Sequence, residues 1–135
     1  MSEPLSDQVR RFVDGLSHAT IATLDADGAV HQAVVWFMRD GDELVVNSAA
    51  GRRWPTNLRR DPRMSLVVAN EAGDWVGFRG TVHSVDDPER GQADIAELAR
   101  RFDPAGADER IRVFRTQSRV TFRLAPERIH VEIEG

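Results

Sequence analysis

The chain has 135 residues, of which 41% are hydrophobic and 30% charged, and this composition fits one compact domain with its own core. The formal net charge of −4 disfavours a nucleic-acid partner, which needs excess positive charge. No apolar run approaches the roughly 18 residues of a membrane span, and the first residues lack the pattern of a signal peptide. With no cysteine and no lysine, the chain cannot use disulfides, thiolates, cysteine-based zinc sites or lysine Schiff bases. We expect a single cytoplasmic domain over residues 1–135.

The first part of the chain predicts a helix followed by three antiparallel strands. Apolar residues between Leu5 and Leu16 recur at helical spacing, and the helix that they predict ends near Gly15. Two short turns then contain the Asp and Gly residues that favour hairpins. The strands that these turns connect cover residues 20–24, 30–38 and 44–48.

The second part predicts a short helix, four more strands and two further helices. The short helix interrupts the meander between residues 52 and 62, with Pro55 near its start and Pro62 at its end. The elements after it are, in order, strands at 64–70 and 75–85, a helix from Asp87, a helical stretch near 109–115, and strands at 120–124 and 129–133. Six or seven strands favour a small barrel, because closure removes unpaired strand edges. A β-sandwich would give the same pattern.

Residues 52–63 concentrate positive charge in an otherwise acidic chain. Five arginines and one aspartate give this segment a charge of +4, which leaves −8 for the remainder. A phosphate is held by hydroxyl, amide and guanidinium donors near a helix start, and such donors come here from Ser48, Arg52, Arg53, Thr56 and Asn57. We interpret the segment as an anion site; the alternative is a solvated helix face.

The other three arginines of the segment fall on the far side of the short helix. There they either pair with carboxylates or attract an acidic cofactor tail; they are Arg59, Arg60 and Arg63.

Few side chains point to chemistry of their own. The four histidines, His18, His31, His83 and His130, have no metal-ligand spacing, and no acid–base pair or nucleophile stands out, so we predict no catalytic and no metal-binding residue. An indole can cover a tricyclic ring, although a tryptophan in a strand often only packs in a core or an interface. Among Trp36, Trp54 and Trp75, we expect Trp54 to meet a ligand because it lies in the cationic turn.

The order of these features resembles the flavin- and deazaflavin-binding split β-barrel superfamily typified by pyridoxamine 5′-phosphate oxidase. Within it, the chain looks most like the branch of probable F420-dependent oxidoreductases. The most specific part of the resemblance is the stretch NLRRDPR at 57–63, followed by a strand from Met64. Ala22–Leu24 with Gly28, and the step from Arg79 to Thr81, support it.

The resemblance implies a mainly β fold: a six-stranded antiparallel split β-barrel of the FMN-binding, Greek-key type. It also implies a homodimer with a cofactor in each groove at the interface. Carried over by position, the phosphate contacts are Ser48, Arg52 and Asn57, with backbone contacts from Ala49 and Pro55, and the ring lies along His31, Gln32, Ala33, Val34 and Trp36. Relatives commonly place a phosphate-contacting lysine where this chain has Trp54, so Arg52 or Arg53 would have to replace it.

The resemblance therefore implies an oxidoreductase that uses the deazaflavin coenzyme F420 to transfer hydride to an unsaturated small molecule. The absence of an evident acid–base pair agrees with this, because in hydride transfer the cofactor carries the reaction and the protein binds and orients it. Two alternatives remain: an FMN-dependent oxidoreductase on the same fold, and a non-catalytic protein that binds flavin or haem. We expect no nucleic-acid or membrane partner.

Overall fold

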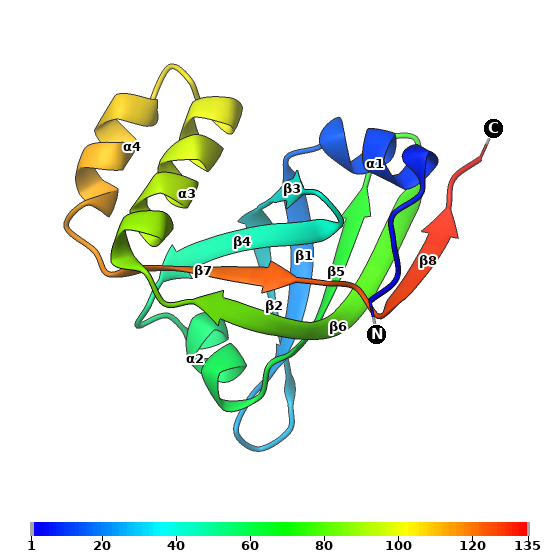
Figure 1. Cartoon of the computed structure of the whole chain (residues 1–135), viewed down its shortest axis with the longest axis horizontal. Helices are drawn as coiled ribbons and strands as arrows, with labels where there is room; N and C mark the ends of the chain where they lie inside the picture. Colours follow the sequence, from blue (N-terminus) through cyan, green and yellow to red (C-terminus); the bar gives the residue numbers. More distant parts are fainter. Residues whose placement is uncertain (1, 135) are drawn as a thin grey trace.

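The computed structural model describes residues 2–134, which form a mainly β fold with four helices (Figure 1). The helices are α1 (Asp7–Asp14), α2 (Arg53–Arg60), α3 (Pro88–Phe102) and α4 (Ala107–Phe114). The strands are β1 (His18–Leu24), β2 (Val30–Trp36), β3 (Met38–Asp40), β4 (Glu43–Ala49), β5 (Arg63–Ala69), β6 (Trp75–Val85), β7 (Arg119–Leu124) and β8 (Arg128–Glu132).

The strands form one curled sheet in which every pairing is antiparallel. Its order is β2-β1-β5-β6-β7-β4-β3, and β8 pairs with β6 beside this path. The two ends of this order, β2 and β3, are consecutive in the chain and separated only by Phe37. The sheet therefore curls so far that its last strand continues from its first, as Figure 1 shows.

The prediction of six strands is wrong, because residues 2–134 contain eight. One extra strand arises where residues 30–38, expected to be a single strand, divide at the buried Phe37. Trp36 still pairs with His18 of β1, whereas Met38 pairs with Val45 of β4. A run of apolar residues predicts extended backbone, but it does not reveal where a strand changes its partner. The other additional strand is β8, which was predicted from its alternation but has no place in a six-stranded barrel.

The predicted helices are confirmed, with small shifts at their ends. The hydroxyl of Ser6 caps α1 by accepting a hydrogen bond from the Val9 N–H, and Asp87 caps α3 in the same way through the Glu89 N–H. The last helix begins at Ala107, two residues before its predicted start. No helix among residues 2–134 combines the length and the apolar character needed to cross a membrane.

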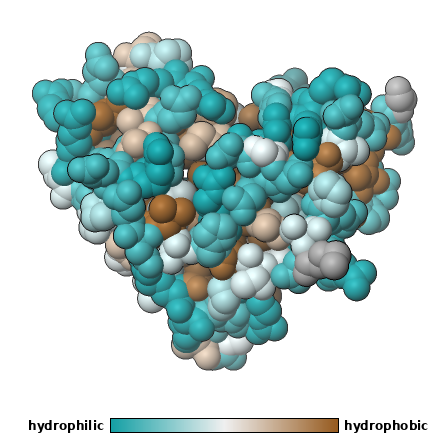
Figure 2. All heavy atoms as spheres, viewed as in Figure 1, coloured by the Kyte–Doolittle hydropathy of each residue, from teal (hydrophilic) through white to brown (hydrophobic). Residues whose placement is uncertain are grey.

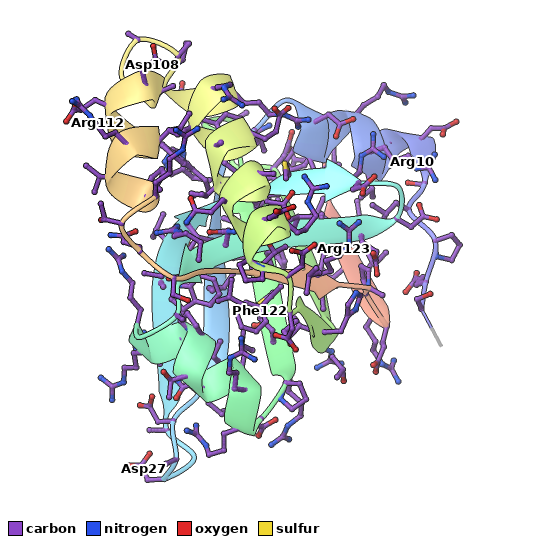
Figure 3. All side chains as sticks on the ribbon, turned by 60° about the vertical axis from the view of Figure 1, so that its left-hand side comes forward. Arg10, Asp27, Asp108, Arg112, Phe122 and Arg123 are labelled. Atoms are coloured by element: carbon purple, nitrogen blue, oxygen red, sulfur yellow. The ribbon has the colours of Figure 1, made fainter. Side chains whose placement is uncertain are left out.

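Two hydrophobic clusters hold the molecule together. The larger lies inside the curled sheet, where inward-facing strand residues meet α1 and the buried Trp54 and Leu58 of α2. The smaller lies between α3 and α4, and Trp36 and Phe114 pack against it. Figure 1 shows α3 and α4 standing beside the sheet as a separate pair, and Figure 2 shows that hydrophilic residues cover most of this face of the molecule. Figure 3 places Phe122 on β7, with Asp108 and Arg112 on α4 away from the sheet.

Candidate functional site

A cleft of about 600 Å³ opens between the sheet and the α3–α4 pair. β2 forms one wall, the end of β4 and the start of α2 form another, and α3, α4 and the start of β7 contribute the rest. The predicted site residues that line this cleft are His31, Ala33, Val34, Trp36, Ser48, Arg52, Arg53 and Trp54. The fold thus brings the two predicted halves of the site together, the strand for a ring and the turn for a phosphate.

Five of the predicted site residues do not line the cleft: Gln32, Ala49, Pro55, Thr56 and Asn57. Gln32 is exposed in β2 between His31 and Ala33, and so on the opposite face of that strand. The Thr56 hydroxyl donates a hydrogen bond to the Arg52 carbonyl (2.8 Å), within its own helix. Asn57 is buried, and its Nδ2 donates to Thr23 Oγ1 (3.1 Å) and Asp25 Oδ1 (2.9 Å). These contacts hold α2 against the β1–β2 turn.

Arg53 lines the cleft, but a carboxylate compensates its charge. Its Nε and Nη2 donate to the two oxygens of Asp25 at 3.0 and 2.9 Å. Hydrogen bonds from Asn57 and then from Arg53 hold the pKa of Asp25 below its usual value. Arg53 is therefore a weaker anion ligand than its position in the sequence suggests.

The start of α2 lacks an acceptor for its first N–H groups. Arg52 occupies the N-cap position and makes no capping hydrogen bond, because a guanidinium can only donate. The first turn contains no acidic residue, so the N–H groups of Arg53 and Trp54 have no side-chain acceptor from the cap. The buried Ser48 lies nearby and also lines the cleft. A helix start with free N–H groups and adjacent cations is suited to bind an anion.

Arg119, at the start of β7, was not predicted as a site residue. Its Nε donates to Asn47 Oδ1 (3.0 Å), its Nη1 donates to Gln117 Oε1 (2.8 Å), and its guanidinium lies 4.6 Å from the centre of the Phe114 ring. Burial, and to a lesser degree the charge of Arg52, lowers the pKa of Arg119 to about 10, so the side chain stays charged at neutral pH. Only the fold brings it beside the cationic turn, and the sequence offered no signal beyond strand alternation.

Arg52 and Arg119 give the cleft an uncompensated positive charge. Four arginines line it, and none of its lining residues among 2–134 is an aspartate or glutamate. Arg53 pairs with Asp25, and Arg110 pairs with Asp103 (2.6 Å). Within the described part of the chain, neither Arg52 nor Arg119 forms an ion pair with a carboxylate.

The other three arginines of the cationic segment each have a partner; Arg59 and Arg60 end α2, and Arg63 begins β5. Arg59 pairs with Asp86 (3.2 Å), and Arg60 donates to the Leu24 carbonyl and to Asn57. Arg63 pairs with Asp61 (2.7 Å), and hydrogen bonds from the Arg63 side chain and backbone lower the pKa of Asp61 to about 2. Arg59 and Arg63 thus pair with carboxylates, as the first alternative predicted, whereas Arg60 contacts only neutral oxygens.

The three tryptophans occupy different environments. Trp36 lines the cleft, with the Arg110 guanidinium 5.1 Å from its ring centre and the Phe102 ring at 6.3 Å. Trp54 also borders the cleft but is only 5% exposed, and it packs in the main core 5.8 Å from the Phe122 ring. Trp75 stacks on His130 at 5.0 Å and does not line this cleft. Trp36 is therefore the better placed of the three to contact a planar ligand.

Comparison with known proteins places the chain in a family. A family model described as pyridoxamine 5′-phosphate oxidase matches residues 5–131. The conserved hypothetical protein Rv2991 from Mycobacterium tuberculosis has the same fold, with a TM-score of 0.80 and 23% identity over 95% of this chain and 84% of that one. No curated protein sequence matches the chain.

Two other solved structures share this fold. A protein named F420 reductase has a TM-score of 0.75 and 20% identity, covering 93% of this chain and 98% of its own. HutZ, described as a haem storage protein from Vibrio cholerae, has a TM-score of 0.73 and 22% identity, covering 96% of each chain. At such identities the structures show the fold alone. The family model spans nearly all of the sequence, and the chain belongs to the pyridoxamine 5′-phosphate oxidase family.

Proposed function

We propose that this protein is an oxidoreductase that binds the deazaflavin coenzyme F420 in the cleft and transfers hydride from it to an unsaturated small molecule. One observation carries the proposal: Arg52 and Arg119, both without a carboxylate partner in the described chain, line the same cleft as Ser48, and Arg52 is the N-cap of the uncapped α2. These groups match the needs of a phosphate, and the family to which the chain belongs binds flavins, of which FMN carries a phosphate.

The remainder of the cleft suits a planar ring. Ala33 and Val35 share one face of β2, and together with Trp36 at the end of the strand they offer apolar surface to the cleft, on which a tricyclic ring system can lie. When bound, the deazaflavin supplies the hydride chemistry itself. The chain's own residues would anchor the phosphate, orient the ring along β2 and, through α3 and α4, shield one side of the cleft from water.

The preference for F420 over FMN rests on the NLRRDPR stretch at 57–63 and is supported by the fold shared with the F420 reductase. FMN carries the same kind of phosphate, so an FMN-dependent oxidoreductase remains the nearest alternative. A haem-binding role is favoured by a different observation: two imidazoles, those of His18 and His31, line the cleft and are potential iron ligands.

We further propose that the protein acts as a homodimer. Val34 on β2 and Val67 on β5 are 69% and 36% exposed. Both pair with Thr20 of the strand between them, so they share one outer face of the sheet. Trp75, two residues from the Gly77 that pairs with Val67, projects from the same face and is 37% exposed. A second copy of the chain would cover this surface.

The experiment that tests the function is a pair of titrations, with F420 and with FMN, followed by turnover. We expect F420 to bind more tightly than FMN, and the reduced coenzyme to be oxidised in the presence of a panel of enones and quinones. Tighter binding of FMN together with flavin-dependent turnover would favour the FMN enzyme. A Soret band on adding haemin, with no turnover of either coenzyme, would favour the binding protein.

A further inference from the structure

Arg119 differs from most other arginines of the chain in the groups that accept its hydrogen bonds. Ten other arginines form ion pairs with aspartate or glutamate side chains. The half-buried Arg119 instead donates to two neutral amide oxygens, Oδ1 of Asn47 at 3.0 Å and Oε1 of Gln117 at 2.8 Å. An amide oxygen fixes the direction of a guanidinium N–H without cancelling its charge.

The orientation of the Asn47 amide is itself fixed. Asn47 is 7% exposed, and its Nδ2 donates to the Gly91 carbonyl (2.9 Å) and to Thr121 Oγ1 (3.0 Å). Because both acceptors need the NH₂ group, the amide oxygen must face Arg119. The Thr121 hydroxyl donates in turn to Asp94 Oδ2 (2.8 Å), whose other oxygen pairs with Arg90 (3.2 Å). Asp94, the buried carboxylate at the end of this series of hydrogen bonds, is thus separated from Arg119 by the side chains of Asn47 and Thr121.

Gln117 is held from its backbone side. Gln92 Nε2, on α3, donates to the carbonyls of Phe114 and Gln117, both at 2.9 Å. These bonds fix the turn that leads from α4 into β7. The Gln117 side chain then reaches Arg119 two residues later, and the Phe114 ring covers the guanidinium at 4.6 Å.

We propose that Asn47 and Gln117 are positioning residues that hold Arg119 as an uncompensated cation, so that its charge is available to a phosphate-type anion in the cleft. The inference rests on the anion site of the proposed function, and it explains why amides rather than carboxylates hold this arginine. A carboxylate at either position would form an ion pair with Arg119 and compete with the ligand.

The sharpest test is Gln117→Glu, a nearly isosteric change at a partly exposed position. Gln8→Glu on the exposed face of α1 is the matched control, since it adds the same charge away from the cleft. The probes are FMN, riboflavin, which lacks the phosphate, and inorganic pyrophosphate. We expect Gln117→Glu to weaken the binding of FMN about tenfold or more and to change the affinity for riboflavin less than twofold. It should also reduce the thermal stabilisation by pyrophosphate. Gln8→Glu should leave all three unchanged.

Asn47→Asp is the second variant, and circular dichroism would first establish that it folds. It should show the same selective loss of FMN over riboflavin, whereas a merely structural role would weaken both flavins alike. If Gln117→Glu binds FMN and pyrophosphate like the parent, or if pyrophosphate does not stabilise the parent at millimolar concentration, the inference is wrong. If Gln117→Glu reduces the thermal stabilisation by pyrophosphate as expected, but the parent binds no flavin or deazaflavin, the inference stands and the proposed coenzyme is wrong.

Discussion

At the scale of single residues, the positive charges around the cleft are not equivalent. Arg53 and Arg110 each have a carboxylate partner, whereas Arg52 and Arg119 have none among the described residues. The sequence presents Arg52 and Arg53 as equal candidates because they are neighbours. Only the fold distinguishes them, by placing Asp25 of the β1–β2 turn against Arg53.

We therefore expect Arg52→Ala and Arg119→Ala each to weaken binding of a phosphate-bearing coenzyme. A charge-assisted hydrogen bond contributes roughly 1.5–3 kcal/mol, which corresponds to about ten- to a hundredfold in the dissociation constant. Titration with F420 or FMN measures the effect, and Arg60→Ala, which lies on the far side of α2, serves as the control. Binding by both variants with the parent's affinity would remove these arginines from the site.

Asp25 links the same contacts to pH. Hydrogen bonds from Asn57 and Arg53 lower its pKa in the folded state, so its stabilising contribution is present above the unfolded-state pKa of about 4 and is lost as the pH falls through the lower folded value. Asp25→Asn should thus lower Tm at neutral pH, with a difference that vanishes in acid. Asp27→Asn, at the tip of the same turn (Figure 3), is the control, because it removes a carboxylate from this turn and leaves the contacts of Asp25 with Arg53 and Asn57 in place.

At the scale of elements, the strand and helix positions follow from local patterns, and the site does not. Alternation and Asp–Gly turns predicted β1 and β4 to β8, because burial of one face and turn geometry are local properties. The break at Phe37 and the contact between Arg119 and Asn47, 72 residues apart, depend on which strands become neighbours. Sequence patterns therefore predicted Arg52 and Arg53 as site residues but missed Arg110 and Arg119, which line the same cleft.

Helix α2 contributes a core residue where relatives are expected to carry lysine. Trp54 is 5% exposed and packs on Phe122, so Trp54→Lys should lose about 3–5 kcal/mol of stability, the usual cost of removing a large buried side chain. Denaturant unfolding measures this, and Trp54→Phe should cost less. If Trp54→Lys instead tightens phosphate binding at unchanged stability, a lysine is tolerated there and the start of α2 adopts the family's arrangement.

Helix α3 approaches β7 through Gly91, and this contact sets the edge of the cleft. A Cβ at Gly91 would overlap the Arg119 carbonyl group, so Gly91→Ala should force α3 away from β7, lower Tm and weaken coenzyme binding together. Gly15→Ala is the matched control, because a Cβ there meets only ordinary contacts of 3.7 and 3.8 Å. A fully stable Gly91→Ala variant with normal binding would show that this helix can shift without affecting the site.

At the scale of the whole molecule, the exposed outer face of the sheet leads to a prediction about assembly. Val67 pairs with Thr20 on one side and Gly77 on the other, so its side chain stands at the centre of this face, with Val34 two strands away. If a second copy covers the face, Val67→Glu buries an unpaired carboxylate in the interface, which costs several kcal/mol, and light scattering should show a dimeric parent and a monomeric variant. Val113→Glu is the matched control, because Val113 is more exposed, at 48%, but lies on α4; it should remain a dimer. A parent that is monomeric at micromolar concentration would contradict the homodimer, and a single chain would then form the whole cleft. A dimer that survives Val67→Glu would place the interface on another surface.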